Sequence, residues 1–223
     1  MKYPIFNSII TVIETELASR GITPERFKVW QDGTLHATGL ELALKLQDDD
    51  SGVREITINF DWDTFREAKL ARLLEGMSQH PLLQRKKLLE SKAALTLDIE
   101  TAWHFEESQV LPAAQSPNLR KVAAVAEDRR TAYASAWIQA LNAEITRSLP
   151  QENVISRWHL EMEGDLHGKY VSNMSLLAYH QFPLHAMQQL SDVHGQVRLN
   201  LQKVLSRVLR VLRLASRTRP EAA

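Results

Sequence analysis

Strict alternation of apolar and polar residues in three separate segments constrains the fold of this chain more than any other feature. Leucines occupy every second position of 40–46, and isoleucine, phenylalanine and tryptophan do the same in 56–62. In 97–105 the alternate positions are Leu97, Ile99, Thr101, Trp103 and Phe105. Such alternation gives a strand one apolar and one polar face, so each segment is predicted to be a strand buried on one side. The turn-forming cluster at 48–52 separates the first two segments, which we expect to pair as an antiparallel hairpin.

Between these strands, apolar residues recur with helical spacing, and prolines and glycines end the segments. The predicted order is helix, three strands, one or two helices, strand, helix, two strands and helix. The predicted helices cover about 4–20, 65–77, a basic stretch around 85–87, 119–148 and 185–218; the later strands cover 158–162 and 170–179.

Strands that alternate this cleanly are typical of antiparallel sheets with one packed face. We therefore predict an α+β fold, with an antiparallel sheet and long helices packed mainly on one face, as a single domain over 1–223. Trp103-His104-Phe105-Glu106 and Trp158-His159-Leu160-Glu161 form a short internal echo. This echo leaves open two related lobes, 1–110 and 117–218.

Composition favours a globular protein of a reducing compartment. Hydrophobic residues make up 44% of the chain and charged residues 24%, which is close to the globular average. Cysteine is absent, which excludes disulfides, thiolate metal sites and cysteine nucleophiles. Neither a signal peptide nor an apolar run of about 20 residues is visible. A cytoplasmic location and no transmembrane segment are expected.

The internal echo also gives the candidate metal ligands. His104 with Glu106, and His159 with Glu161, are spaced two apart on predicted strands and should share the polar face. If the two strands are neighbours, these side chains could converge into a site for a divalent metal or for acid/base chemistry. The alternative is a solvated sheet face with ordinary cross-strand pairs.

The C-terminal segment, about 185–218, is predicted to be a basic amphipathic helix. Residues 193–223 carry seven basic and one acidic side chain, so this tail is about +6 while the rest of the chain is about −6. One arc of the helix is apolar, and the opposite arc holds Lys203, Arg207, Arg210, Arg213 and Arg217. Three interpretations stay open: packing on the body or a second subunit, binding to an anionic membrane, and binding to nucleic acid.

Nucleotide-binding, zincin and serine-hydrolase motifs are absent, which lowers the expectation of an enzyme. The opening order of helix, three strands and helix is similar to that of small bacterial secretion chaperones. That resemblance implies dimerisation and binding to a partner segment. Our leading hypothesis is a non-enzymatic, adaptor-like protein that binds a protein partner or itself as a homo-oligomer, without a cofactor. The alternatives are a metal-assisted or acid/base enzyme and a protein that binds nucleic acid or anionic membranes.

Overall fold

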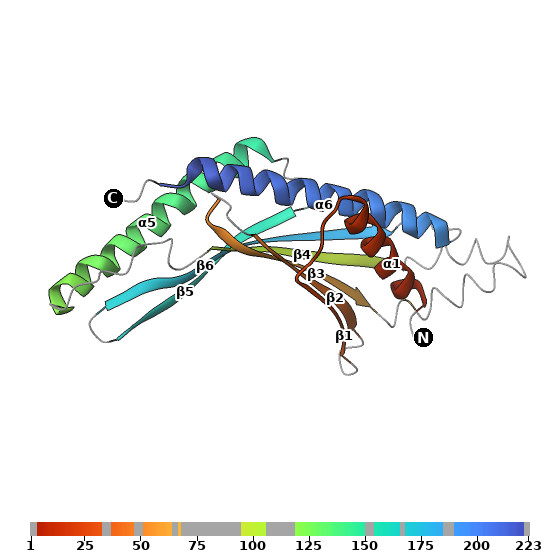
Figure 1. The fold of residues 1–223 in the computed structure, drawn as a ribbon, viewed down its shortest axis with the longest axis horizontal. Helices are drawn as coiled ribbons and strands as arrows, with labels where there is room; N and C mark the ends of the chain where they lie inside the picture. Colours follow the sequence, from red (N-terminus) through yellow and green to blue (C-terminus); the bar gives the residue numbers. More distant parts are fainter. Residues whose placement is uncertain are drawn as a thin grey trace, which may run out of the picture. The chain divides into compact units, whose positions relative to one another are not determined.

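The structure is a computed structural model that describes residues 4–32, 37–46, 51–63, 67, 95–105, 119–149, 154–165, 168–184 and 190–220. Within these residues the chain forms three helices and one six-stranded antiparallel sheet (Figure 1), so the predicted α+β class is confirmed. The helices are α1 (Pro4–Ser19), α5 (Leu119–Ser148) and α6 (Leu190–Thr218). The strands are β1 (Arg26–Asp32), β2 (Ala37–Lys45), β3 (Val53–Asp63), β4 (Leu95–Phe105), β5 (Val154–Asp165) and β6 (Gly168–Leu184).

The strand order in the sheet is β1-β2-β3-β4-β6-β5. The three alternating segments of the sequence correspond to β2, β3 and β4. Strand β2 lies beside β3, as the predicted hairpin requires. At the end of that hairpin the Leu46 N–H donates to the Arg54 carbonyl over 3.2 Å. The helices predicted at 65–77 and around 85–87 lie outside the described residues, apart from Glu67.

The chain forms two compact units. The first comprises Met1–Ala43, Ile58–Glu100 and His180–Leu205, and the second comprises Leu44–Thr57, Thr101–Tyr179 and Ser206–Ala223. Helix α1 and strand β1 belong to the first unit, whereas α5 and β5 belong to the second.

In the first unit, the start of α1 is tied to the end of β3 by a buried carboxylate. Pro4 begins the helix, where its missing N–H costs nothing because the first N–H groups of a helix have no intrahelical acceptor. Glu67 accepts the N–H groups of Ile5 (2.8 Å) and Phe6 (3.4 Å) and the indole N–H of Trp62 (2.5 Å). Burial raises the pKa of Glu67, and these three hydrogen bonds oppose the rise. Phe6 also stacks on Trp62, with ring centroids 6.0 Å apart.

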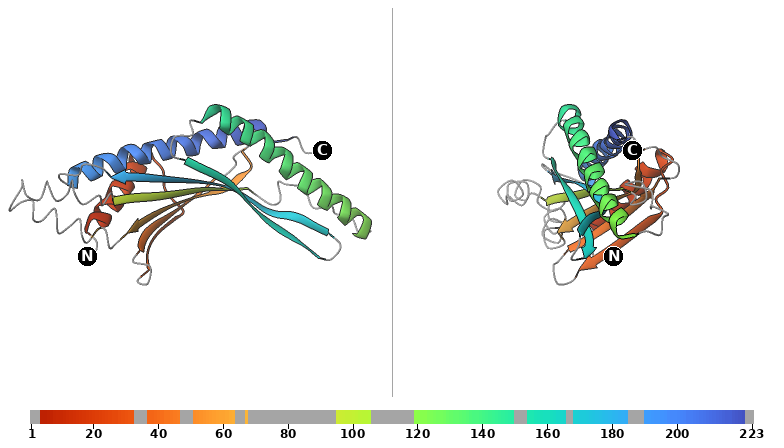
Figure 2. Two further views of the ribbon diagram at one scale, coloured as in Figure 1. Left: turned by 180° about the vertical axis from the view of Figure 1, so that it is seen from behind. Right: turned by 90° about the vertical axis from the view of Figure 1, so that its left-hand side faces the viewer.

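Helix α1 lies beside the first part of α6 (Figure 2), and a second carboxylate links the two helices. Glu16 accepts hydrogen bonds from Arg20 (3.0 Å) and Gln202 (3.1 Å), and Arg198 lies 3.9 Å away. The Arg20 hydrogen bond is the main reason why the pKa of Glu16 is lowered; Gln202, and the charges of Arg20 and Arg198, also lower it, while burial opposes them.

In the second unit, aromatic side chains join α5 to the strands beneath it. Phe105 of β4 meets Trp137 of α5 edge to face at 4.8 Å, and Trp158 of β5 lies 5.7 Å from the same Phe105 ring. The Trp158 indole N–H donates to the Asn142 side chain of α5 over 2.7 Å. These contacts fix one face of β5 toward the helix and leave the opposite face away from it.

Candidate interaction surface

Strand β5 is the terminal strand of the sheet and runs for 12 residues beside β6 (Figure 1). Within the described part of the chain, no strand pairs with its outer side. A terminal strand presents a row of backbone N–H and C=O groups to which another strand can bind. Native proteins usually protect such edges by making them short, charged or covered. The length of β5 makes it a candidate surface for binding another chain.

Three large apolar side chains of β5 are exposed: Ile155 (72%), Met162 (48%) and Leu160 (41%). Leu160 and Met162 lie on the same face as Trp158, the face that carries the contacts to α5. Clean alternation would lead one to expect these two side chains to be buried. Their exposure means that this part of the apolar face has no complete cover within the described residues.

The opposite face of β5 is charged. Arg157 stacks on the Tyr179 ring of β6, with the guanidinium carbon 4.9 Å from the ring centroid, and donates to the Tyr179 hydroxyl over 2.6 Å. His159 lies 3.9 Å from Glu161, and Asn173 of β6 donates to Glu161 over 3.2 Å. These contacts to β6 hold Arg157 and Glu161 in place along the strand.

The sequence of β5 is self-complementary about Leu160. If two copies of the strand run antiparallel with Leu160 facing Leu160, Arg157 faces Glu163 and His159 faces Glu161. On the other face Trp158 then lies opposite Met162. Arg157 therefore meets an opposite charge on one face, where His159 also faces a carboxylate, and apolar side chains meet on the other face. A shift of the partner by two residues would place His159 opposite His159 and remove the Arg157–Glu163 pair.

The candidate metal ligands lie on strands that are not neighbours, because β6 lies between β4 and β5. His104 lies 3.1 Å from the Thr57 hydroxyl of β3, and Glu106 falls outside the described residues. His159 and Glu161 are both exposed on β5. Across the residues that the structure describes, no group of three or more His, Asp or Glu side chains could hold a metal ion. The sheet order therefore does not meet the condition on which a shared His/Glu site depends.

The amphipathic pattern of α6 agrees with its burial. All eight residues of the predicted apolar arc are buried: Val197, Leu201, Val204, Leu205, Val208, Val211, Leu212 and Ala215. Four of the five basic candidates are exposed: Lys203, Arg210, Arg213 and Arg217. The fifth, Arg207, is only partly exposed, and burial lowers its pKa. The basic arc is therefore exposed at four of its five positions, and Arg207 is partly buried.

Sequence patterns identified β5 as a strand but missed that it is an edge. The signal that was present in the sequence is the charge pattern of β5, which reverses sign about Leu160 while the apolar residues keep their alternation. None of the described helices is long and apolar enough to cross a membrane. Comparison of the chain with known proteins found no matching family model, no matching curated protein and no matching solved structure.

Proposed function

We propose that this chain is a non-enzymatic interaction protein that forms a homodimer by antiparallel pairing of β5 with β5 of a second copy. The observation that carries this proposal is the self-complementary edge strand with its exposed apolar side chains. Pairing would satisfy the outer backbone groups of both copies and cover Leu160 and Met162. It would join the two sheets edge to edge.

Two-fold symmetry would strengthen the dimer, because each contact between two different residues occurs twice in such an interface. Each Arg157–Glu163, His159–Glu161 and Trp158–Met162 pair would occur twice, and the Leu160 pair once. Cross-strand pairs of these kinds contribute about 0.2 to 1 kcal/mol each. Backbone hydrogen bonds along the central residues of β5 would add to the affinity. A dimer of this kind fits an adaptor that presents two identical surfaces to a protein partner.

Charge exchange across the interface tests the pairing and its register. Arg157→Glu would place like charges opposite each other twice, and we expect the dimer dissociation constant to rise roughly tenfold or more. Adding Glu163→Arg in the same chain restores opposite charges and should return most of the affinity. Sedimentation equilibrium measures both. Arg213→Glu, at an exposed position of α6, is the matched control and should leave the dissociation constant unchanged.

Two results would count against the proposal. One is a wild-type chain that stays monomeric at millimolar concentration. The other is a double variant that dimerises no better than Arg157→Glu alone, since the two charges would then not face each other. Thermal unfolding of each variant separates a lost interface from a lost fold.

The exposed basic face of α6 supports a second candidate function, binding to an anionic macromolecule. Lys203, Arg210, Arg213 and Arg217 would neutralise phosphates, and such binding weakens steeply as salt is added. Titration of a fluorescent duplex DNA and of a single-stranded RNA at two salt concentrations tests it. Absent or salt-independent binding would remove this candidate. A cytoplasmic site of action accords with the lack of cysteine and is part of the same proposal.

A further inference from the structure

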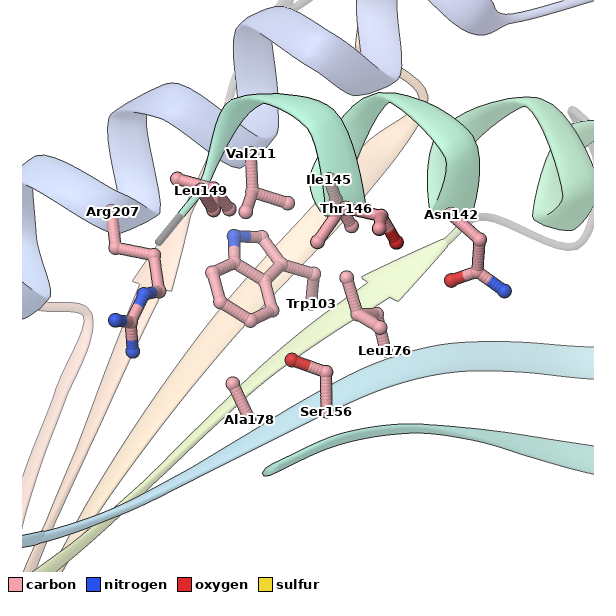
Figure 3. A pocket seen from close by; sticks show the side chains of 10 residues that line it. All are labelled: Trp103, Asn142, Ile145, Thr146, Leu149, Ser156, Leu176, Ala178, Arg207 and Val211. Atoms are coloured by element: carbon pink, nitrogen blue, oxygen red, sulfur yellow. The ribbon is translucent and has the colours of Figure 1, made fainter. Parts of the chain in front are cut away.

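The second unit holds a pocket of about 200 Å³ beneath α5 and α6 (Figure 3). Trp103 of β4 lines it, and further apolar side chains come from Ile145 of α5, Leu149 just after α5 and Val211 of α6. Asn142 and Thr146 of α5, Ser156 of β5 and Arg207 of α6 supply polar groups. An apolar cavity of about 150 Å³ already accommodates benzene, so this pocket has room for a small ring or branched alkyl group.

Arg207 is the one cationic side chain that lines this pocket, and the described residues offer it no carboxylate partner. Figure 3 shows its side chain reaching from α6 along the side of the Trp103 ring. Burial lowers the pKa of Arg207. A partly desolvated guanidinium is costly unless a bound anion pairs with it.

Trp103 adds a second unsatisfied group. The residue is fully buried, and its indole N–H has no hydrogen-bond acceptor among the described residues. A buried donor without an acceptor destabilises a fold by about 1 to 3 kcal/mol, so such groups are rare and usually have a ligand or water as their partner. The wall of the pocket therefore holds an indole N–H that, like Arg207, lacks an acceptor among the described residues.

We propose that this pocket binds a small organic carboxylate, with its apolar group against Trp103 and its carboxylate paired with Arg207. A guanidinium binds a planar carboxylate through two parallel hydrogen bonds, which fixes the orientation of the ligand. The apolar walls disfavour a fully hydrated inorganic anion, because such an ion would lose its water without gaining apolar contact. This site lies apart from the charged face and the outer edge of β5 and extends the proposed function to ligand binding.

Titration of the full chain with benzoate tests the site, with the five indole N–H signals followed by ¹H–¹⁵N NMR. Trp103→Phe identifies the signal of Trp103. We expect this signal to shift with saturation, and Arg207→Gln to weaken binding about tenfold or more, because a hydrogen bond to a charged group is lost. Arg210→Gln is the matched control at an exposed position of the same helix and should bind benzoate as the wild type does.

Ligand comparison on the unaltered chain keeps the test independent of any variant. Benzyl alcohol, which has the ring without the charge, and inorganic phosphate, which has the charge without the ring, should both bind at least about tenfold more weakly than benzoate. The proposal is overturned if benzoate fails to saturate, if benzyl alcohol or phosphate binds equally well, or if Arg207→Gln leaves the affinity unchanged. Because none of these readouts depends on dimer formation, failure here is distinguishable from failure of the β5 interface.

Discussion

At the scale of single residues, the pair formed by Trp30 and Gly39 shows how one side chain depends on the absence of another. The two residues are directly opposite each other in the antiparallel register of β1 and β2. A Cβ atom at position 39 would lie 2.3 Å from the Trp30 ring and 2.6 Å from the Phe60 carbonyl oxygen. The indole therefore covers the glycine, as aromatic side chains do where a glycine interrupts a strand.

Gly39→Ala should therefore destabilise the protein, by about 1 to 3 kcal/mol, because Trp30 and the β3 backbone must move to admit the methyl group. Urea denaturation measures the loss. Gly195→Ala is the matched control, since a Cβ atom there meets no atom within 4 Å and alanine favours a helix. A Gly39→Ala variant as stable as the wild type would show that the sheet admits a Cβ atom at this position without cost.

Glu16 predicts a pH dependence of stability. Its folded pKa is lowered from 4.5, chiefly by the Arg20 hydrogen bond. A lowered pKa contributes stability that is present above the unfolded pKa and is lost as pH falls through the folded value. Glu16→Gln should therefore lower the free energy of unfolding at pH 7 by about 1 kcal/mol, with the difference from wild type shrinking below pH 4.5.

Chemical denaturation at pH 7, 5 and 3 checks this prediction. The exposed Glu14 on the same helix provides the control, and Glu14→Gln should change little at any pH. A Glu16→Gln deficit that is the same at pH 3 as at pH 7 would contradict the ionic origin of the stabilisation.

At the scale of elements, α6 illustrates what helical periodicity predicts well. The buried arc follows from spacing alone, because residues three and four apart share a face. Arg207 departs from the prediction because it follows Val204 by three positions and precedes Val211 by four, which places it beside the buried arc. Its long aliphatic stem can pack there while the guanidinium reaches the pocket.

Two leucines of α6 give an energetic test of that arc. Leu201 is fully buried and Leu199 is 55% exposed, although they are only two positions apart. Leu201→Ala should destabilise the protein by about 2 to 5 kcal/mol through lost burial and a cavity, and Leu199→Ala by about 0.5 kcal/mol or less. Thermal and urea unfolding compare the two. Equal losses would mean that the helix presents a different face to the sheet.

The neighbours of β4 and β5 in the sheet could not be predicted from sequence patterns. Alternation identified both as strands and placed their histidines on the face opposite the tryptophans. It could not give the strand order, because pairing between distant segments depends on the fold of the whole sheet and not on local spacing. Convergence of His104 with His159 was conditional on that order, and β6 separates the two strands.

At the scale of the whole molecule, the fold class was predictable because every local signal agreed with it. Alternating strands, amphipathic helices and turn clusters all indicated an α+β fold with an antiparallel sheet. The proposed site was not predictable in the same way. The edge position of β5 and the pocket around Trp103 arise from segments far apart in the sequence, so each becomes visible only in three dimensions.

The absence of cysteine from this chain permits a direct test of the β5 interface. In the proposed register, Leu160 faces Leu160 of the second copy at a Cα separation of about 4.5 to 5.5 Å, which suits a disulfide. Ile155→Cys is the matched control, because it is also exposed on β5 but would lie about 34 Å from its counterpart. Mild oxidation followed by non-reducing electrophoresis measures the covalent dimer. We expect rapid and nearly complete cross-linking of Leu160→Cys and little of Ile155→Cys; equal yields for the two variants, or none for either, would contradict the proposed pairing of β5.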